Sequence, residues 1–377
     1  MSTVKLGGVS EIRSAIPLSF EVLAHQYFVR GLRAFWRDQA YRGVLEAAQR
    51  CGADADEAEL ERRLRGEPAY ELYAWLERHS QQLKYYGRGG LVRFMEAHGE
   101  QARQMLEAAA RVHPERLRLV PDFEVPAYVR DVDTHQHKGG LFGSAAAALA
   151  YEASSTGFSF SLFDSRSPMQ AYSDAALKLL NSSTGEDCRI VDLGCTIGGS
   201  SRALKRALPK AEVIGYDVCA PVLALAHLRS MEQGLEVFYR QGSAESFDCE
   251  PSSVDLVASH WLFHEMPPAA IRASLAHSFE VLKPGGGLII YDMYLRPGGA
   301  LGKLLHAGYS ARNNEPYAHC YAEMDIVAEL EKAGFDEVSV RIAHPEPDAQ
   351  VIAGELPPAR THYISIVTAR STRSRAS

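Results

Sequence analysis

Polar residues able to transfer protons follow a predicted strand in the stretch SHWLFHEMPP, residues 259–268. A histidine can take a proton from a hydroxyl, amine or acid near neutral pH. His260 is expected at the end of the strand and His264 at the start of the next crossing, so both are candidate bases. The alternative is that they bond the backbone and shape the loop. Glu265 is more typical of an acidic residue at a helix N-terminus.

A second polar set lies in RDVDTHQHKGG, residues 130–140. Two loop histidines two positions apart do not make a metal site by themselves, and we expect no metal here. We interpret the segment as a lid in which His135 and His137 contact the substrate. Tyr172, in SPMQAYSD, is a further catalytic candidate placed to cover the site; its alternative is an ordinary packed aromatic.

A tight glycine turn joins a predicted strand to a predicted helix in VDLGCTIGGSSRAL, residues 191–204. The spacing fits neither the GxGxxG dinucleotide fingerprint nor a GK[ST] phosphate loop. Asp217 ends the next strand, 25 residues after Asp192, where a carboxylate can accept both hydroxyls of a ribose. The polar turn at 242–245 suits an adenine edge. The pattern predicts a site for a nucleoside that carries no phosphate chain. The alternative for Asp192 is that its only role is to cap the following helix.

These residues require strands that end at one edge of a sheet. Helical segments separate most of the strand-like runs, so we expect an α/β fold with a mostly parallel sheet covered by helices on both faces. The last two runs lack a helix between them, so one, most simply the final THYISIVTA, should run antiparallel at the sheet edge. The seven runs are CRIVDLG, AEVIGYDV, EVFYRQG, VDLVASHWL, GLIIYDMY, EVSVRI and THYISIVTA.

The pattern divides the chain into three parts. Residues 1–125 read as an α-helical N-terminal domain or cap, residues 126–185 as a connector and active-site lid, and residues 186–377 as the sheet-containing catalytic domain. Helices are expected to open near Pro17 and Ser19, after Asp54 or Asp56, and near Pro68, and a fourth is expected over 91–112. The helical part could form a homodimer interface.

Composition excludes several function classes. The chain has 377 residues, 46% of them hydrophobic, and a formal net charge of -7, which argues against binding nucleic acid over the whole surface. No apolar run approaches the roughly 20 residues of a membrane helix, and the N-terminus lacks a signal-peptide core. The six cysteines form no CxxC pair, so a reducing, cytoplasmic location is the default.

Taken together, DLGCTIGG, GYDVCAP, GSAES, SVDLVASHWLFHEMP and VLKPGGGLIIYDMY resemble class I S-adenosylmethionine (SAM)-dependent methyltransferases over residues 186–370. The resemblance implies a Rossmann-like, seven-stranded sheet and SAM as cosubstrate, with Asp217 on the ribose and LKPGGG as a turn before the fifth strand. Thr196 replaces the middle glycine of the family's usual [DE]xGxGxG motif, as in a GCTIG-type subset, and narrows the methionine end of the pocket. The residues expected to contact SAM are Asp192, Gly194, Cys195, Thr196, Gly198, Asp217, Val218, Ala244, Glu245 and Ser259.

The acceptor side is expected around the fifth strand and the insert at 298–321. Tyr294 is a candidate substrate or lid residue, and the polar, tyrosine-containing insert favours a small polar acceptor over a lipid or polymer. We therefore expect methyl transfer to a small molecule, plausibly in specialised metabolism. One alternative, known among similar proteins, is cyclisation of SAM itself to azetidine-2-carboxylate and methylthioadenosine. Another is a non-catalytic SAM-binding module.

Overall fold

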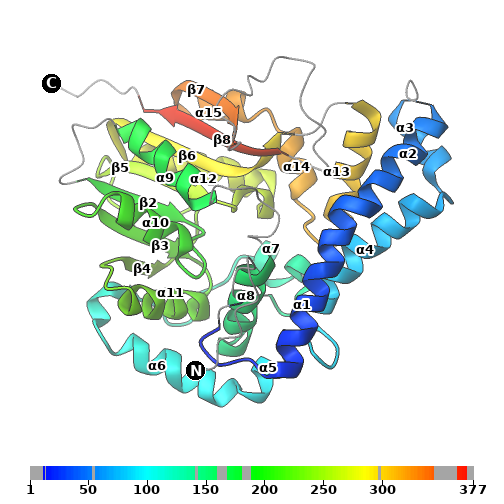
Figure 1. Ribbon diagram of the computed structural model, residues 1–377. Helices are drawn as coiled ribbons and strands as arrows, with labels where there is room; N and C mark the ends of the chain where they lie inside the picture. The colour runs from blue at the N-terminus through cyan, green and yellow to red at the C-terminus, as the bar shows by residue number, and fades with distance from the viewer. Residues whose placement is uncertain are drawn as a thin grey trace.

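An eight-stranded sheet forms the centre of the computed structural model (Figure 1), which describes residues 12, 14–52, 56–140, 143–158, 168–180, 188–295, 299–343 and 363–371. Its order is β1-β4-β3-β2-β5-β6-β8-β7, and the strands β1 to β6 run parallel. The strands are β1 (Leu117–Arg118), β2 (Arg189–Leu193), β3 (Glu212–Asp217), β4 (Phe238–Gln241), β5 (Val254–His260), β6 (Leu282–Leu295), β7 (Asp336–Ile342) and β8 (Tyr363–Arg370).

Helices bury both faces of this sheet, which is why its central strands are almost continuously apolar. In β2, Ile190 faces a cluster that includes residues of α9 (Pro168–Leu180), α10 (Gly199–Ala207) and α11 (Ala220–Glu232). Val191 and Leu193 face the opposite cluster, with α12 (Pro268–Val281) and α15 (Ile326–Ala333). The mostly parallel α/β architecture is therefore confirmed.

Three details of the predicted sheet are wrong. An eighth strand, β1, comes from the N-terminal part and pairs with β4. The sequence did not predict it, because only two residues are extended there and no periodic pattern marks them. The final strand β8 is antiparallel, as expected, but lies between β6 and β7 rather than at the edge. The LKPGGG segment belongs to β6, where a register shift between Val254 and Leu256 of β5 accommodates it.

Helices dominate the N-terminal part, and sequence signals fix several of their starts. The Ser19 hydroxyl accepts a hydrogen bond from the Val22 N–H, and the Asp56 carboxylate from the Glu59 N–H. The predicted helix over 91–112 is interrupted at His98, where φ is -110°. The elements are α1 (Phe20–Phe35), the π-helix η1 (Trp36–Ala40), α2 (Tyr41–Cys51), α3 (Glu57–Leu64), α4 (Pro68–Tyr85), α5 (Leu91–Ala97), α6 (Gly99–Ala110) and η2 (Pro114–Arg116).

The predicted connector contains ordered helices. The short α7 (Ala127–Arg130) and η3 (Thr134–Gln136) precede α8 (Ala145–Phe158), whose alanines pack closely against α5, α6 and α11. Residues 159–167, within the predicted connector and active-site lid, lie outside the described residues. The three-part division of the chain stays a prediction.

Buried charge joins the N-terminal helices to the insert after β6. Arg312 of α13 (Gly299–Asn313) pairs with Glu77 of α4, and Asn313 Nδ2 donates to Glu77 Oε1 at 3.2 Å. Glu77 is only 1% exposed, so removing either partner would leave an uncompensated buried charge. In Figure 1, α2, α3 and α4 stand beside α13, and α6 runs along α11. The elements η5 (Phe263–Glu265) and α14 (Ala318–Glu323) complete the fold.

The described part of the chain holds no helix with the length and apolar content needed to cross a lipid bilayer.

The turn between β2 and α10 gives a matched pair of substitutions. Gly198 has φ +70°, and a Cβ there would overlap the Tyr239 hydroxyl and lie 2.9 Å from Ala226 Cβ. A Cβ on the adjacent Gly199 would lie 3.7 Å from Met169 Cε, an ordinary contact. Gly198→Ala should lower the free energy of unfolding by about 2–4 kcal/mol, from backbone strain plus overpacking. Gly199→Ala should leave it unchanged or slightly raised. Urea unfolding of both variants is the measurement, and equal effects would contradict the assignment.

Candidate functional site

Three left-handed residues shape the turn after β2. Gly194, Thr196 and Gly198 have φ of 65°, 44° and 70°. The resemblance expects a glycine at position 196, and Thr196 adopts the backbone conformation that this glycine would have. The left-handed conformation costs a threonine roughly 1–2 kcal/mol. Threonine in place of glycine therefore adds a side chain to the turn without changing the backbone conformation.

Asp192 lies beneath this turn and is completely buried. Its Oδ1 accepts from the Tyr172 hydroxyl at 2.9 Å, and its Oδ2 from Ser200 at 2.6 Å and Ser201 at 2.5 Å. Burial raises the pKa of Asp192 to about 6, against these three donors. The carboxylate therefore joins β2 to α9 and to the first turn of α10. Tyr172 was expected as a catalytic cover, but it is 0% exposed and positions Asp192.

Asp217 stands at the end of β3, next to the same turn. Its Oδ2 accepts from the Thr196 N–H and its Oδ1 from the Cys219 N–H, both at 2.9 Å. Burial raises the pKa of Asp217, while the backbone donors oppose the shift. Each carboxylate oxygen keeps acceptor capacity after one hydrogen bond. This arrangement can hold a pair of neighbouring hydroxyls.

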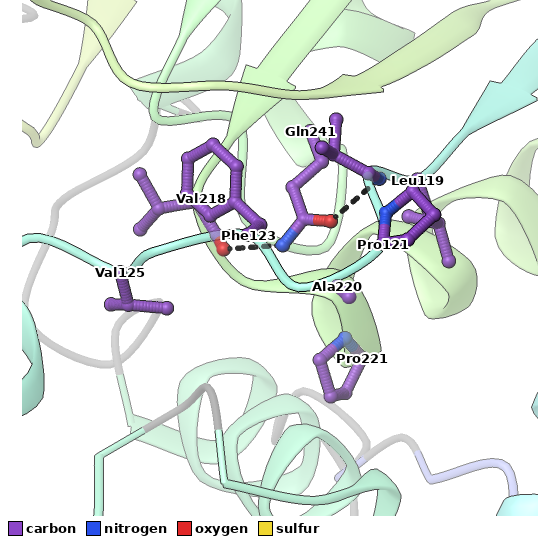
Figure 2. A pocket seen from close by; sticks show the side chains of 9 residues that line it. Leu119, Pro121, Phe123, Val125, Val218, Ala220, Pro221 and Gln241 are labelled. Carbon is purple, nitrogen blue, oxygen red and sulfur yellow. Dashed lines mark hydrogen bonds between the residues drawn. The ribbon is translucent and has the colours of Figure 1, made fainter.

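An apolar cavity of about 470 Å³ lies at the carboxyl ends of β3 and β4, and Val218, the residue after Asp217, lines it (Figure 2). Val218 and the first turn of α11 form one wall, and the loop at 119–125 forms the other. Gln241 joins them: its Nε2 donates to the Val218 carbonyl at 3.0 Å, and its Oε1 accepts from the Val120 N–H at 3.0 Å. The sequence analysis missed this loop, which only Pro121 and Pro126 mark as irregular. The lining residues are Leu119, Val120, Pro121, Phe123, Val125, Val218, Ala220, Pro221 and Gln241.

The remaining residues expected to contact SAM divide between the site and the core. Glu245 accepts from the Tyr128 hydroxyl at 3.1 Å, and the charges of both Glu245 and Asp217 raise the pKa of Tyr128 beyond the effect of burial. The side chains of Cys195, Ala244 and Ser259 are buried among core residues, at 1%, 8% and 0% exposure.

His260 is the last residue of β5 and sits among aromatic rings. Its ring stacks on Tyr291 with centroids 4.8 Å apart and meets Tyr172 edge-on at 5.2 Å. Burial lowers the pKa of His260 to about 3, so the ring is neutral at physiological pH. A base with so low a pKa is poorly matched to abstracting a proton near pH 7.

His264 forms a buried ion pair with β6. Its Nδ1 lies 2.6 Å from Asp292 Oδ1, and its Nε2 lies 3.4 Å from Glu265 Oε1. Burial alone would lower the pKa of His264, but these carboxylates raise it well above its usual value. The pairing with Asp292 therefore favours the protonated form of His264, and its role as a base stays a prediction.

The predicted lid residues separate. His137 is 2% exposed and packs edge-on against Tyr85 of α4, with centroids 4.6 Å apart, and burial lowers its pKa to about 4. The Tyr294 hydroxyl donates to the Met324 carbonyl at 2.9 Å, which anchors the chain between α14 and α15. Neither side chain reaches the site formed by Asp217 and Thr196. Of the three lid residues, only His135 belongs to a group of polar residues near that site.

His135 meets two carboxylates, one of which the sequence analysis missed. Its Nδ1 lies 2.7 Å from Glu315 Oε1, and its Nε2 lies 3.4 Å from Glu265 Oε1. Glu315 belongs to the insert, where a glutamate before a proline gives no distinctive signal. Its pKa is lowered by the neighbouring His135 and His264, against the effect of burial.

Tyr151 of α8 links this polar group to the glycine turn. Burial raises the pKa of Tyr151 to about 12, a hydrogen bond with the Thr196 side chain lowers it, and the charges of Glu265 and Asp217 raise it. One tyrosine therefore lies between the ribose-type carboxylate and the polar group around His135. Tyr151 was also missed, because it lies at the end of an alanine run that reads as a packing helix.

Comparisons with known proteins agree with this geometry. The family model described as a methyltransferase domain matches residues 190–286. A demethylmenaquinone methyltransferase from Thermus thermophilus is 32% identical over 114 residues, covering 30% of this chain and 51% of that protein. A ubiquinone biosynthesis O-methyltransferase from Nitrosococcus oceani is 31% identical over 145 residues, covering 38% and 59%. The chain thus spans about half to three fifths of these curated relatives.

Among solved structures, the Haemonchus contortus phosphoethanolamine N-methyltransferase 2 in complex with SAM aligns over 54% of this chain and 57% of that one, with 19% identity and a TM-score of 0.42. The segment that matches the methyltransferase-domain model runs from Ile190 in β2 to Gly286 in β6. It includes Asp192, Asp217 and the glycine turn between them. Over this segment, the chain matches the methyltransferase-domain family and is similar to known methyltransferases.

Proposed function

We propose that this protein transfers a methyl group from SAM to a small polar molecule. The observation that carries the proposal is the carboxylate of Asp217, 7% exposed, held by two backbone N–H groups and followed by Val218, which lines an apolar cavity. A carboxylate that can take two hydroxyls next to an apolar slot suits a nucleoside. The methyltransferase-domain match, which includes Asp217, supports SAM as that nucleoside.

On the donor side, this chain's residues divide the binding. Asp217 would hold the ribose, and the slot over Val218 would take the adenine. Thr196 and Tyr151 would border the methionine arm, because their side chains meet at the open side of the glycine turn. The sulfonium methyl is already activated, so the protein's main task is to align the acceptor and exclude water.

On the acceptor side, the group His135, Glu265 and Glu315 favours a polar molecule. Glu315 is fully buried, and the side chains of His135 and Glu265 are 26% and 21% exposed. Such a half-enclosed polar wall suits a small acceptor better than a chain or a membrane lipid. His260 is neutral with a low pKa and the protonated form of His264 is favoured, so we assign neither as the base.

The helical N-terminal part carries the further proposal of a homodimer. Phe20, Phe28 and Trp75 on α1 and α4 are 85%, 62% and 52% exposed. Burial of this face in a second copy would remove apolar surface from water. Sedimentation velocity of the full chain is the direct measure.

Asp217→Ala should abolish SAM binding. Losing an ionised acceptor for two hydroxyls costs about 3–6 kcal/mol, which is at least a 100-fold loss of affinity. Calorimetric titration with SAM is the measurement. Asp248→Ala is the control, because Asp248 is exposed. The contact described for its side chain is an ion pair with the exposed Arg118 at 2.9 Å. Unchanged affinity in Asp217→Ala would overturn the ribose assignment, provided its thermal unfolding matches the wild type.

His260→Phe should have a pH-dependent effect on stability. The folded-state pKa of about 3 lies below the unfolded value of about 6.5, so between them the unfolded chain binds the extra proton. His260 therefore costs stability as pH falls below about 6.5. Phenylalanine keeps the ring stack on Tyr291 without titrating. Relative to wild type, the variant should gain roughly 2 kcal/mol between about pH 7.5 and about pH 5. Urea unfolding at both pH values measures this, and a pH-independent difference would contradict it.

The reaction itself is decided by the nucleoside product. The purified protein is incubated with SAM alone and with SAM plus a pool of small acids, amines and phenols. S-adenosylhomocysteine formed only with the pool is the expected result, and the acceptor then carries one added methyl in its mass. Methylthioadenosine formed without an acceptor, above the protein-free control, would instead establish cyclisation or lysis of SAM. Asp217→Ala serves as the inactive control in both arms.

A further inference from the structure

Three segments far apart in the sequence bring together a compact set of metal-ligating side chains. His135 comes from η3, Glu265 from η5, and Glu315 from the segment between α13 and α14. Each offers one ligand atom, and these atoms all lie within 4.8 Å of one another. The sequence analysis expected no metal, because it considered only neighbouring residues such as His137, whereas the two carboxylates lie 130 and 180 positions further along the chain.

Glu315 supplies independent evidence for a missing cation. The residue is 0% exposed, and its Oε1 accepts from the Tyr309 hydroxyl at 3.2 Å. Its Oε2 has no hydrogen-bond partner among the described residues, and His264 Nε2 lies 4.0 Å away. A buried carboxylate oxygen without a partner is costly. A cation bound between Glu315, Glu265 and His135 would satisfy it.

The backbone around His135 is held in an unusual conformation that aims its ring at the carboxylates. His135 and Gln136 have φ of 56° and 62°, in the left-handed region. The Gln136 side chain accepts from Gln82 Nε2 at 3.4 Å and donates to the Arg312 carbonyl at 3.1 Å. Asn314 Nδ2 donates to the Asp133 carbonyl at 2.8 Å. The strain is thus maintained by contacts with α4 and α13, as is common where function needs a fixed side chain.

We propose that His135, Glu265 and Glu315 bind a divalent transition-metal ion such as Mn²⁺. Metal–ligand bonds of about 2.0–2.2 Å place two ligands of one ion at most about 4.4 Å apart, so the observed spread closes with small side-chain rotations. One imidazole and two carboxylates suit Mn²⁺, and the Tyr309 hydroxyl orients Glu315 from the outer shell. Three protein ligands leave coordination positions open.

The open coordination positions of the metal could bind the methyl acceptor, an inference that rests on the proposed function. Glu265 lies close to the glycine turn, because its N–H donates to the Leu262 carbonyl at 2.9 Å and a Cβ on Gly194 of that turn would lie 2.8 Å from Leu262 Cδ1. The metal therefore lies on the acceptor side of the nucleoside site. A hydroxyl or carboxylate oxygen of the acceptor can occupy an open position, which orients that oxygen toward the donor.

The test uses the full-length protein, stripped with EDTA, exchanged into metal-free buffer and titrated with MnCl₂. Electron paramagnetic resonance measures free Mn²⁺. We expect one site in the wild type and an affinity loss of at least about 100-fold in Glu315→Gln, because even outer-shell partners cost about 10–100-fold. Glu265→Gln, at a half-exposed position, should lose affinity similarly and guards against a folding defect in Glu315→Gln. Glu323→Gln is the control, since Glu323 faces His319 at 3.3 Å in an exposed pair.

Each outcome decides the proposal. Saturable binding in the wild type and in Glu323→Gln, lost in both cluster variants, supports the site. Absence of saturable binding in the wild type, or equal binding in all four proteins, overturns it and leaves the cluster as an ion-pair network only. Calorimetry with SAM on the same samples separates the two proposals. Intact SAM binding without Mn²⁺ binding defeats the metal site alone, whereas Mn²⁺ binding without SAM binding defeats the proposed donor.

Discussion

The buried carboxylate of Asp192 is the constraint on which the site depends. It accepts hydroxyl hydrogen bonds from α9 and from the first turn of α10, so it fixes where the strand, the turn and two helices meet. The turn above it then directs the Thr196 N–H to Asp217 on the neighbouring strand. The position of the ribose-type carboxylate therefore depends on a residue whose two carboxylate oxygens both accept hydrogen bonds inside the protein.

Local pattern was enough to predict the central strands, the glycine turn and Asp217. Alternating elements of fixed length force parallel strands, and parallel strands bring their carboxyl ends to one edge. The protonation states of His260 and His264 were beyond that reasoning. They depend on Tyr291 and Asp292, which stand 28 or more positions away and reach the histidines only after β5 and β6 pair.

The polar group on the acceptor side was missed for a related reason. Glu315 lies in an insert that carries no motif, and it meets His135 through tertiary packing alone. The buried pair between Glu77 and Arg312 explains why this packing is specific. It holds α13 against α4, and η3 is then clamped between the two helices. The N-terminal helices thus help to build the acceptor side from a distance.

The pairing of β1 with β4 has a consequence for how such proteins diversify. Five of the residues that line the apolar cavity lie on the N-terminal side of the predicted boundary at 125, namely Leu119, Val120, Pro121, Phe123 and Val125. A fragment that starts after that boundary would lose one wall of the nucleoside pocket and expose the backbone edge of β4, which invites aggregation. Recombination that exchanges the helical part between relatives would consequently alter donor binding as well as acceptor choice, so the two halves are under pressure to evolve as one unit.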